Sequence, residues 1–248
     1  MQVGIFGDSF AAPKNTHPAG ANGSTWFEYL SGHHDVITYG KNGASLFYSM
    51  VLFLSNHHTF DRNIFTITNP HRFVIPDPEQ VLPAHMRFMC GLQSVEIFNE
   101  QVESSSWKNK KEILKIIDHA RNFIIHIQDE QYNEYTHRLI VDEIVRIRPD
   151  TLIVPCFYES SRTITGTLPL VEITNVENKA WGITAKKYSE LMLNHIDTRP
   201  THCSDENNSM LADKINACLC FDRAFELKQE DIILPNSPAS RYIIALNT

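Results

Sequence analysis

Two residues far apart in the chain could together carry out acyl transfer. Ser9 follows an apolar run, Val3 to Phe6, and a glycine, Gly7. The carboxyl end of a first β-strand is where open α/β sheets bind ligands, and Gly7 permits a tight turn that projects the hydroxyl. His202 lies in a proline-containing loop before a helical segment. A histidine titrates near neutral pH, so His202 could accept the proton that Ser9 must lose to become a nucleophile.

The elements that must bring these two loops together alternate between strand and helix. We expect strands at 3–6, 35–39, 63–68 and 151–157, and helices at 25–31, 46–55, 111–125, 130–146, 181–194 and 207–219. The apolar run 123–125 could instead begin a buried strand, and 232–234 and 242–246 could form two edge strands. Such alternation predicts a mostly parallel sheet with helices on both faces.

The chain length suits one α/β domain with additions. We expect the domain to span 1–220, with an insertion around 73–112 and a C-terminal extension, 221–248, packed on the domain. The insertion holds several prolines and a polar stretch, 103–111, that is expected to be exposed. The insertion could form a lid over the site or an ordinary surface loop, and the sequence favours neither alternative.

Composition narrows the class of partner. The formal net charge of -7 argues against binding to a nucleic-acid backbone. No apolar run is long enough to span a bilayer, and no basic segment followed by an apolar one opens the chain. The five cysteines are an odd number without regular spacing, which fits a reducing compartment. These features predict a cytoplasmic protein with no nucleic-acid or membrane partner, and they leave the oligomeric state open.

Neither a metal ion nor an organic cofactor is expected. The adjacent histidines at 33–34 and 57–58 point in different directions within a regular element, so each pair seldom holds one ion. Gly4 and Gly7 lack the third glycine of a dinucleotide-binding fingerprint. Cys156, at the end of an apolar strand, is expected to be a core residue rather than a nucleophile.

Four short motifs resemble the sequence blocks of the SGNH (GDSL-type) hydrolases, which contribute Ser, Gly, Asn and His in that order. Gly7-Asp8-Ser9-Phe10 matches the first block, with Phe in place of the usual Leu, and Gly43-Ala44-Ser45 resembles the second. Asn69 matches the asparagine of the third block and His202 the histidine of the last. The resemblance implies a flavodoxin-like three-layer α/β/α sandwich with a mostly parallel five-stranded sheet.

The resemblance also implies a role for each matched residue. Ser9 is the nucleophile and His202 the general base. The backbone N–H groups of Ser9 and Gly43 and the side-chain amide of Asn69 form the oxyanion hole. A carboxylate normally orients the histidine, and Asp197 is the residue that we assign to this position.

Two departures from the family pattern bear on activity. The third block reads Ile67-Thr68-Asn69-Pro70 instead of Gly-x-Asn-Asp and keeps only the Asn. Arg199 stands where an Asp usually precedes the histidine by three residues. Asp197, Asp205 or a backbone carbonyl could orient His202, the last leaving a Ser-His dyad. Loss of the orienting carboxylate costs a serine protease about 10⁴ in kcat.

A second feature of the altered third block is Arg72. The sequence Thr-Asn-Pro-x-Arg is similar to SGNH-like proteins of tailed phages and their hosts. Arg72 could bind an anionic group of the substrate or be an ordinary surface arginine.

The resulting hypothesis is a serine esterase or acyl transferase that acts on a small-molecule O-acyl ester, such as an O-acetylated carbohydrate or nucleoside. The alternative is a catalytically silent binding protein of the same fold that recognises a small molecule or a partner protein. A separation of about 3 Å between the Ser9 hydroxyl and His202 Nε2 would favour the enzyme.

Overall fold

The computed structural model describes residues 1–13, 24–41, 43–75, 81–82, 88–157, 165–180 and 203–234. The strands are β1 (Gln2–Phe6), β2 (Asp35–Thr38), β3 (Arg62–Ile67), β4 (Arg72–Val74), β5 (Phe88–Cys90) and β6 (Leu152–Pro155). The helices are α1 (Trp26–Leu30), α2 (Leu46–Asn56), α3 (Gly91–Ser104), α4 (Lys110–His126), α5 (Glu130–Ile147), α6 (Val171–Ala180) and α8 (Asp205–Phe221). Two 3-10 turns, η2 (His57–Thr59) and η4 (Gln229–Asp231), complete the elements.

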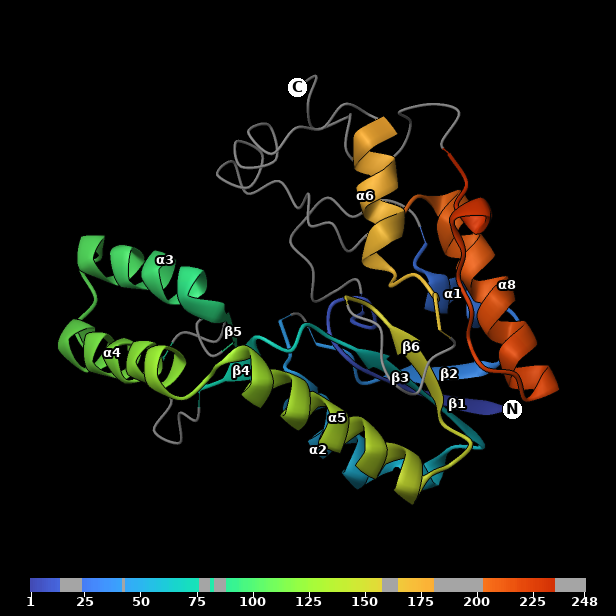
Figure 1. The fold of residues 1–248 in the computed structure, drawn as a ribbon, viewed down its shortest axis with the longest axis horizontal. Coiled ribbons are helices and arrows are strands. Elements are labelled where there is room, and N and C mark those ends of the chain that lie inside the picture. The colour runs from blue at the N-terminus through green and yellow to red at the C-terminus, as the bar shows by residue number, and fades with distance from the viewer. Residues whose placement is uncertain are drawn as a thin grey trace.

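The main sheet is parallel and has the strand order β2-β1-β3-β6. Val3 of β1 pairs with Val36 of β2 on one side and with Arg62 of β3 on the other. Helices cover both faces, which confirms the predicted three-layer α/β/α fold (Figure 1). Within the described residues this sheet has four strands, however, so the expectation of five was wrong in number.

The candidate fifth strands have other structures or lie outside the described residues. Residues 123–125 continue α4, whose apolar face reaches Ile124. At Ile233 the backbone N–H and carbonyl both bond to the side chain of Asn207, at 2.8 and 2.9 Å, so a side chain takes the place of a neighbouring strand. The expected strand at 242–246 and helix at 181–194 fall among residues that are not described.

Two apolar clusters lie on opposite faces of the sheet, as expected when a parallel sheet is covered on both sides. Successive residues of a strand alternate between the clusters: Ile64 packs with α1 and α8, whereas Phe65 packs with α2 and α5. Gly4 is required beside this second cluster because a Cβ there would collide with the Phe60 ring. The sheet therefore packs between two apolar layers, one on each face.

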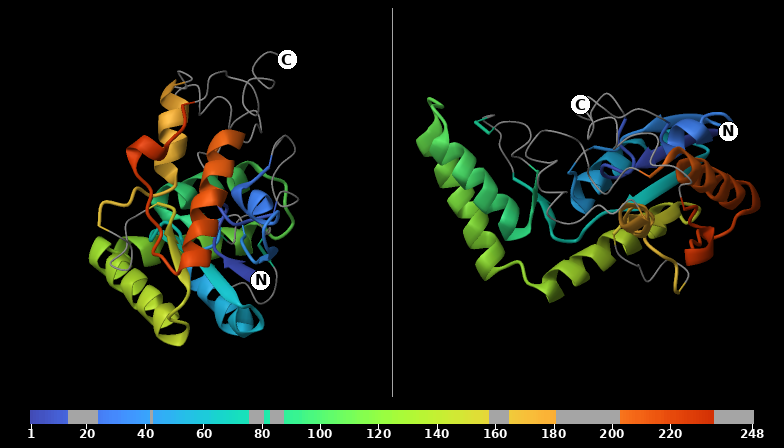
Figure 2. Two further views of the ribbon diagram at one scale, coloured as in Figure 1. Left: turned by 90° about the vertical axis from the view of Figure 1, so that its right-hand side faces the viewer. Right: turned by 90° about the horizontal axis from the view of Figure 1, so that it is seen from above.

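A helical arm extends from the sheet between β3 and α5 (Figure 2). It consists of the antiparallel pair β4–β5 and the helices α3 and α4, which pack against each other. Its own apolar cluster includes Val95, Val102, Ile113 and Ile117. The arm is therefore held by a core separate from those of the sheet.

The helices that pack on the sheet, α1, α2, α5 and α8, begin at its carboxyl edge and end at its amino edge. Side chains cap the starts of all four: Thr25 caps α1, Ser45 caps α2, Asp129 caps α5 and Ser204 caps α8. The cap that the sequence predicted at Ser45 is confirmed. Helix starts carry partial positive charge, so the carboxyl edge favours bound or developing negative charge.

None of the helices among the described residues combines the length and the apolarity that crossing a membrane would require.

Candidate active site

The loop after β1 is anchored by a fully buried carboxylate, Asp8. Its Oδ1 accepts the backbone N–H of Phe10 at 3.1 Å, which closes a tight turn around Ser9. Its Oδ2 accepts the hydroxyl of Thr68 at 2.7 Å and the Arg72 guanidinium at 2.6 Å. Asp8 therefore joins the Ser9 turn to the segment that follows β3.

The Ser9 side chain is buried at this turn, with 3% of its surface exposed. Its Oγ has no hydrogen-bond partner among the residues that the structure describes. A buried hydroxyl without a partner costs about 1–3 kcal/mol relative to a solvated one. Such a group is rare in a folded protein and calls for an explanation, of which a catalytic role is one.

The loop after β2 lies directly against the Ser9 turn. Lys41 N–H donates to the Gly7 carbonyl at 3.1 Å, and a Cβ on Gly40 would collide with the backbone of Ala11. Gly43 follows with φ of 76°, in the left-handed region that glycine adopts without a Cβ penalty. Gly43 thus stands between this loop and the first residues of α2.

Asn69 occupies the third corner of the site, just after β3. Its Oδ1 accepts the His71 N–H at 2.9 Å, while its own carbonyl accepts the Arg72 N–H at 3.1 Å. No described residue accepts from its Nδ2. The side chain is therefore held by its oxygen, and within the described part of the chain its amide protons are not engaged.

Arg72 is mostly buried and is not an ordinary surface arginine, since 14% of its side chain is exposed. Besides Asp8, its Nη1 donates to Thr68 Oγ1 at 3.0 Å. The guanidinium carbon lies 4.8 Å from the centre of the Phe157 ring, a cation–π arrangement. That Arg72 also binds an anionic group of a substrate stays a prediction.

His202 and Asp197 lie outside the described residues, so their distances to Ser9 stay predictions. The chain is described again from Cys203, which is buried in the same cluster as Phe10 and Ala11. Ser204 then caps α8, and its N–H donates to the buried carboxylate of Glu177 at 2.8 Å. The described chain that resumes after His202 therefore begins in the same apolar cluster as the Ser9 turn.

Asp205, another acid that could orient His202, has a partner of its own. It is the first residue of α8, and its Oδ1 accepts the backbone N–H of Ser24 at 3.0 Å. This bond ties the start of α8 to the start of α1.

Two histidines near Asn69 were not recognised in the sequence. His71 Nδ1 accepts the side-chain amide of Asn133 at 2.9 Å, and His137 Nε2 donates to the Thr68 carbonyl at 3.0 Å. Burial lowers the pKa of His137, although the bond to Thr68 opposes this shift. The spacing within α5 could have pointed to His137, because Asn133 and His137 lie on the same helical face as the buried Ile140 and Ile144.

Cys156 at the end of β6 is a core residue, as predicted. Its side chain is fully buried, and burial raises the pKa of the thiol well above its usual value, with the charge of Asp8 adding to the shift. A thiol held protonated is a poor nucleophile. Among the described residues, no three His, Cys, Asp or Glu side chains are grouped so that they could hold a metal ion.

Comparisons with known proteins do not assign a family. No family model matches the chain, and no curated protein matches it. A solved structure of the lipase Lip_vut3 from a goat rumen metagenome aligns with 12% identity and a TM-score of 0.32, over 88% of this chain and 96% of that one. Similarity at this level supports no argument about activity.

Proposed function

We propose that this protein is a serine acyl hydrolase of the SGNH type that cleaves an ester of a small molecule. The observation that carries the proposal is the arrangement of three segments at the carboxyl edge of the sheet. Ser9 brings a buried hydroxyl that no described residue satisfies, while Gly43 and Asn69 bring potential hydrogen-bond donors from neighbouring loops. A nucleophile with preorganised donors beside it is what acyl transfer requires.

The first chemical step follows from these groups. Ser9 Oγ attacks the ester carbonyl carbon while His202 accepts the hydroxyl proton. The carbonyl oxygen becomes an oxyanion and accepts hydrogen bonds from the N–H groups of Ser9 and Gly43 and from Asn69 Nδ2. The capped start of α2, two residues beyond Gly43, adds a favourable dipole.

The second half of the reaction returns the protein to its starting state. Collapse of the tetrahedral intermediate breaks the bond to the alcohol, which leaves with the proton from His202. Water then attacks the acyl-serine, with His202 as base, and releases the carboxylic acid. Asp197 holds the imidazole in the required orientation in this proposal, and transfer to another alcohol instead of water would make the protein an acyl transferase.

Active-site labelling tests the proposal. An alkyl fluorophosphonate should add once to the wild-type protein, as read by intact mass, and should fail to add to Ser9→Ala and His202→Ala. Thr151→Val is the matched control, because Thr151 Oγ1 is also buried without a partner among the described residues but lies at the amino end of β6. Thr151→Val should label like the wild type.

Hydrolysis of 4-nitrophenyl acetate by the same variants completes the test. Ser9→Ala should lower kcat/KM by about 10⁴-fold or more, the loss seen when a serine hydrolase loses its nucleophile. A folded wild-type protein that neither labels nor hydrolyses would overturn the proposal and favour a binding protein of the same fold.

A further inference from the structure

A cleft of about 270 Å³ opens beside the proposed catalytic residues, between the start of α2, the strand β4 and the helix α5. We name it the α5 cleft. Two of the three loops of the site reach it, because Ser45 follows the Gly43 turn and Pro70 follows Asn69. The Ser9 turn is linked to it through Arg72, which lines the cleft and pairs with Asp8. The cleft is thus continuous with the segments that surround the proposed reaction centre.

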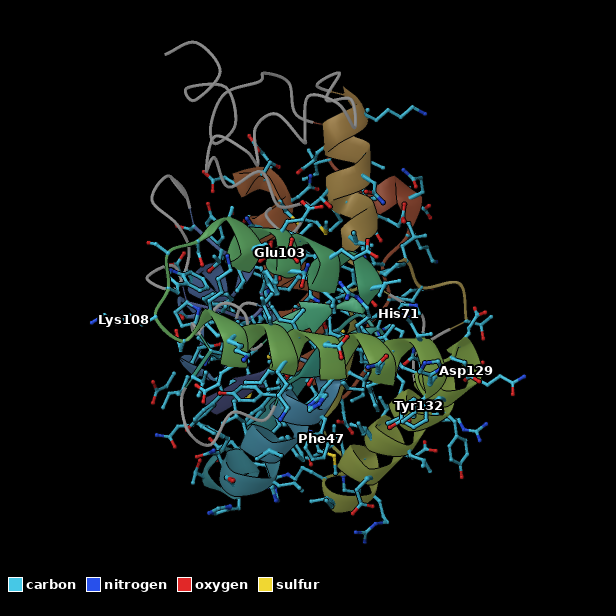
Figure 3. The ribbon with its side chains drawn as sticks, turned by 90° about the vertical axis from the view of Figure 1, so that its left-hand side faces the viewer. Phe47, His71, Glu103, Lys108, Asp129 and Tyr132 are labelled. Carbon is cyan, nitrogen blue, oxygen red and sulfur yellow. The ribbon has the colours of Figure 1, made fainter. Side chains whose placement is uncertain are left out.

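The walls of the α5 cleft are rich in aromatic rings. Phe73, Phe123 and Tyr132 form a row, with 6.1 Å between the first two ring centres and 6.3 Å between the last two. Phe47 of α2 lies across from them, and Figure 3 shows Phe47 and Tyr132 on the same side of the molecule. Exposed fractions of 63% for Phe47 and 45% for Tyr132 leave apolar surface open for a ligand.

The size and chemistry of the α5 cleft select one kind of occupant. Pockets for drug-sized ligands usually enclose about 300–1,000 Å³, so a cleft just below this range suits a single ring better than a long chain. Aromatic rings gain about 0.5–1.5 kcal/mol from edge-to-face or offset contacts beyond their area burial. An acetyl group would leave most of the aromatic wall uncovered.

The face of the sheet on which the cleft opens indicates which part of an ester it holds. Leu46 and Ile140 of the cleft belong to the cluster on the α2–α5 face. Cys203, the neighbour of His202, belongs to the cluster on the opposite face. In the proposed mechanism His202 protonates the leaving alcohol, so an alcohol bound on the face of Cys203 would leave the α5 face for the acyl group.

We infer that the α5 cleft is the acyl-binding subsite and that the substrate is an ester of a single-ring aromatic carboxylic acid. This inference rests on the proposed function and adds the substrate class to it. It also assigns Phe47, Tyr132 and Thr136, which line the cleft, to specificity rather than to catalysis.

Hydrolysis of 4-nitrophenyl benzoate and 4-nitrophenyl acetate tests the inference, because the leaving group is common to both esters. Thr136→Phe places a ring inside the cleft and should lower the benzoate-to-acetate ratio of kcat/KM by at least about tenfold. Leu139→Phe is the matched control, since Leu139 lies on the same helix with 49% of its surface exposed. Phe47→Ala, an exposed position, provides a second variant that should lower the ratio without endangering the fold.

A binding measurement separates this inference from the proposed catalysis. Benzamide, which has the aromatic acyl group but resists cleavage, should give a saturation-transfer NMR signal with both wild type and Ser9→Ala. Thr136→Phe should reduce that signal at least about fivefold and Leu139→Phe should retain it.

The two measurements fail in different ways. Benzamide binding that depends on Thr136, without ester hydrolysis, would support the cleft and overturn the proposed function. The opposite result would be ester hydrolysis with an unchanged benzoate-to-acetate ratio in Thr136→Phe, together with benzamide binding that this substitution does not alter. It would contradict the acyl-binding subsite and remain consistent with the proposed hydrolase.

Discussion

The two edges of the main sheet carry similar features at first sight. At the carboxyl edge an arginine, Arg72, pairs with Asp8 beside a cleft of about 270 Å³. At the amino edge Arg62 pairs with Asp222 beside a larger cavity of about 370 Å³. Each edge also has a buried hydroxyl without a partner among the described residues, on Ser9 and on Thr151. None of these three features, a cavity, an ion pair or an unpaired hydroxyl, therefore distinguishes a site by itself.

Burial and backbone direction do distinguish the two edges. Asp8 has no exposed surface, whereas 79% of the Asp222 side chain is exposed. Helix starts gather at the carboxyl edge, and helix ends, including those of α5 and α8, lie at the amino edge. Among the described residues, the starts of α1, α2, α5 and α8 thus bring positive dipole ends to the edge where Ser9 lies, and this makes that edge suited to an oxyanion.

The largest expected difference between the edges concerns their ion pairs. Arg72→Ala would leave the buried Asp8 carboxylate without its cation, which should cost about 3–5 kcal/mol in free energy of unfolding. Arg62→Ala breaks exposed pairs and should cost about 1 kcal/mol or less. Urea unfolding of both variants measures the two losses, and equal losses would show that burial does not separate the edges.

The next comparison uses two asparagines at opposite ends of β3. Asn69→Ala removes a proposed oxyanion donor and should lower kcat by about 10²–10³-fold with little change in the midpoint of thermal unfolding. Asn63 is fully buried and its Nδ2 donates to the His57 carbonyl at 3.1 Å. Asn63→Ala should therefore destabilise the fold by about 1–3 kcal/mol while kcat stays within about twofold.

Parallel effects of Asn63→Ala and Asn69→Ala on kcat would contradict the assignment of the carboxyl edge as the reaction site. Labelling with fluorophosphonate gives a check on both variants, because neither substitution removes the nucleophile.

A smaller effect is expected for the two unpaired hydroxyls. Ser9→Ala and Thr151→Val each remove a buried oxygen that no described residue satisfies, so the free energy of unfolding should stay unchanged or rise by up to about 1 kcal/mol. Differential scanning calorimetry measures both. A marked loss of stability in Ser9→Ala would indicate that the hydroxyl has a structural partner, and that its burial has no bearing on catalysis.

The smallest expected effect is a change in pH dependence at Glu177. Burial raises the pKa of this carboxyl, against the lowering effect of its hydrogen bonds from Asn207 and Ser204. The folded protein therefore keeps this proton at pH values where the unfolded chain has lost it, so stability falls as pH rises from the ordinary glutamate pKa through the folded one.

Glu177→Gln removes this titration and should flatten the fall in thermal midpoint over that pH window. Glu172→Gln, on the same helix, controls for the loss of one charge. An identical slope in wild type and Glu177→Gln would refute the assignment of the pH dependence to Glu177.

Local sequence patterns predicted most elements because their signals span only a few residues. The apolar positions Trp26, Phe27 and Leu30 predicted the buried face of α1, and Ser45 predicted the start of α2. Patterns of this kind did not predict α6 (Val171–Ala180), because its buried face includes the polar Thr174 and Glu177 beside Ile173 and so gives a weak apolar stripe. The run 123–125 likewise fits a strand or a helix until its neighbours are known.

The candidate site divides in the same way. The order of Ser9, Gly43 and Asn69 after successive strands can be read from the sequence, because the carboxyl ends of parallel strands share one edge. The hydrogen-bond and ion-pair partners around these residues could not be predicted from the sequence. Arg72 lies 64 residues from Asp8, and His137 lies 69 residues from the Thr68 carbonyl that it contacts.

The sequence by itself thus determined a three-layer α/β/α fold and the order in which its polar loops arrive at one edge, because strand and helix periods are local properties. Only the tertiary structure decided that Arg72 neutralises Asp8 and that His137 contacts the Thr68 carbonyl. It also decided that α5 closes an aromatic cleft lined by Ser45, Pro70 and Arg72. These contacts depend on how the helical arm and α5 return to the sheet. That path is set by the packing of separate apolar clusters, which no short stretch of sequence encodes.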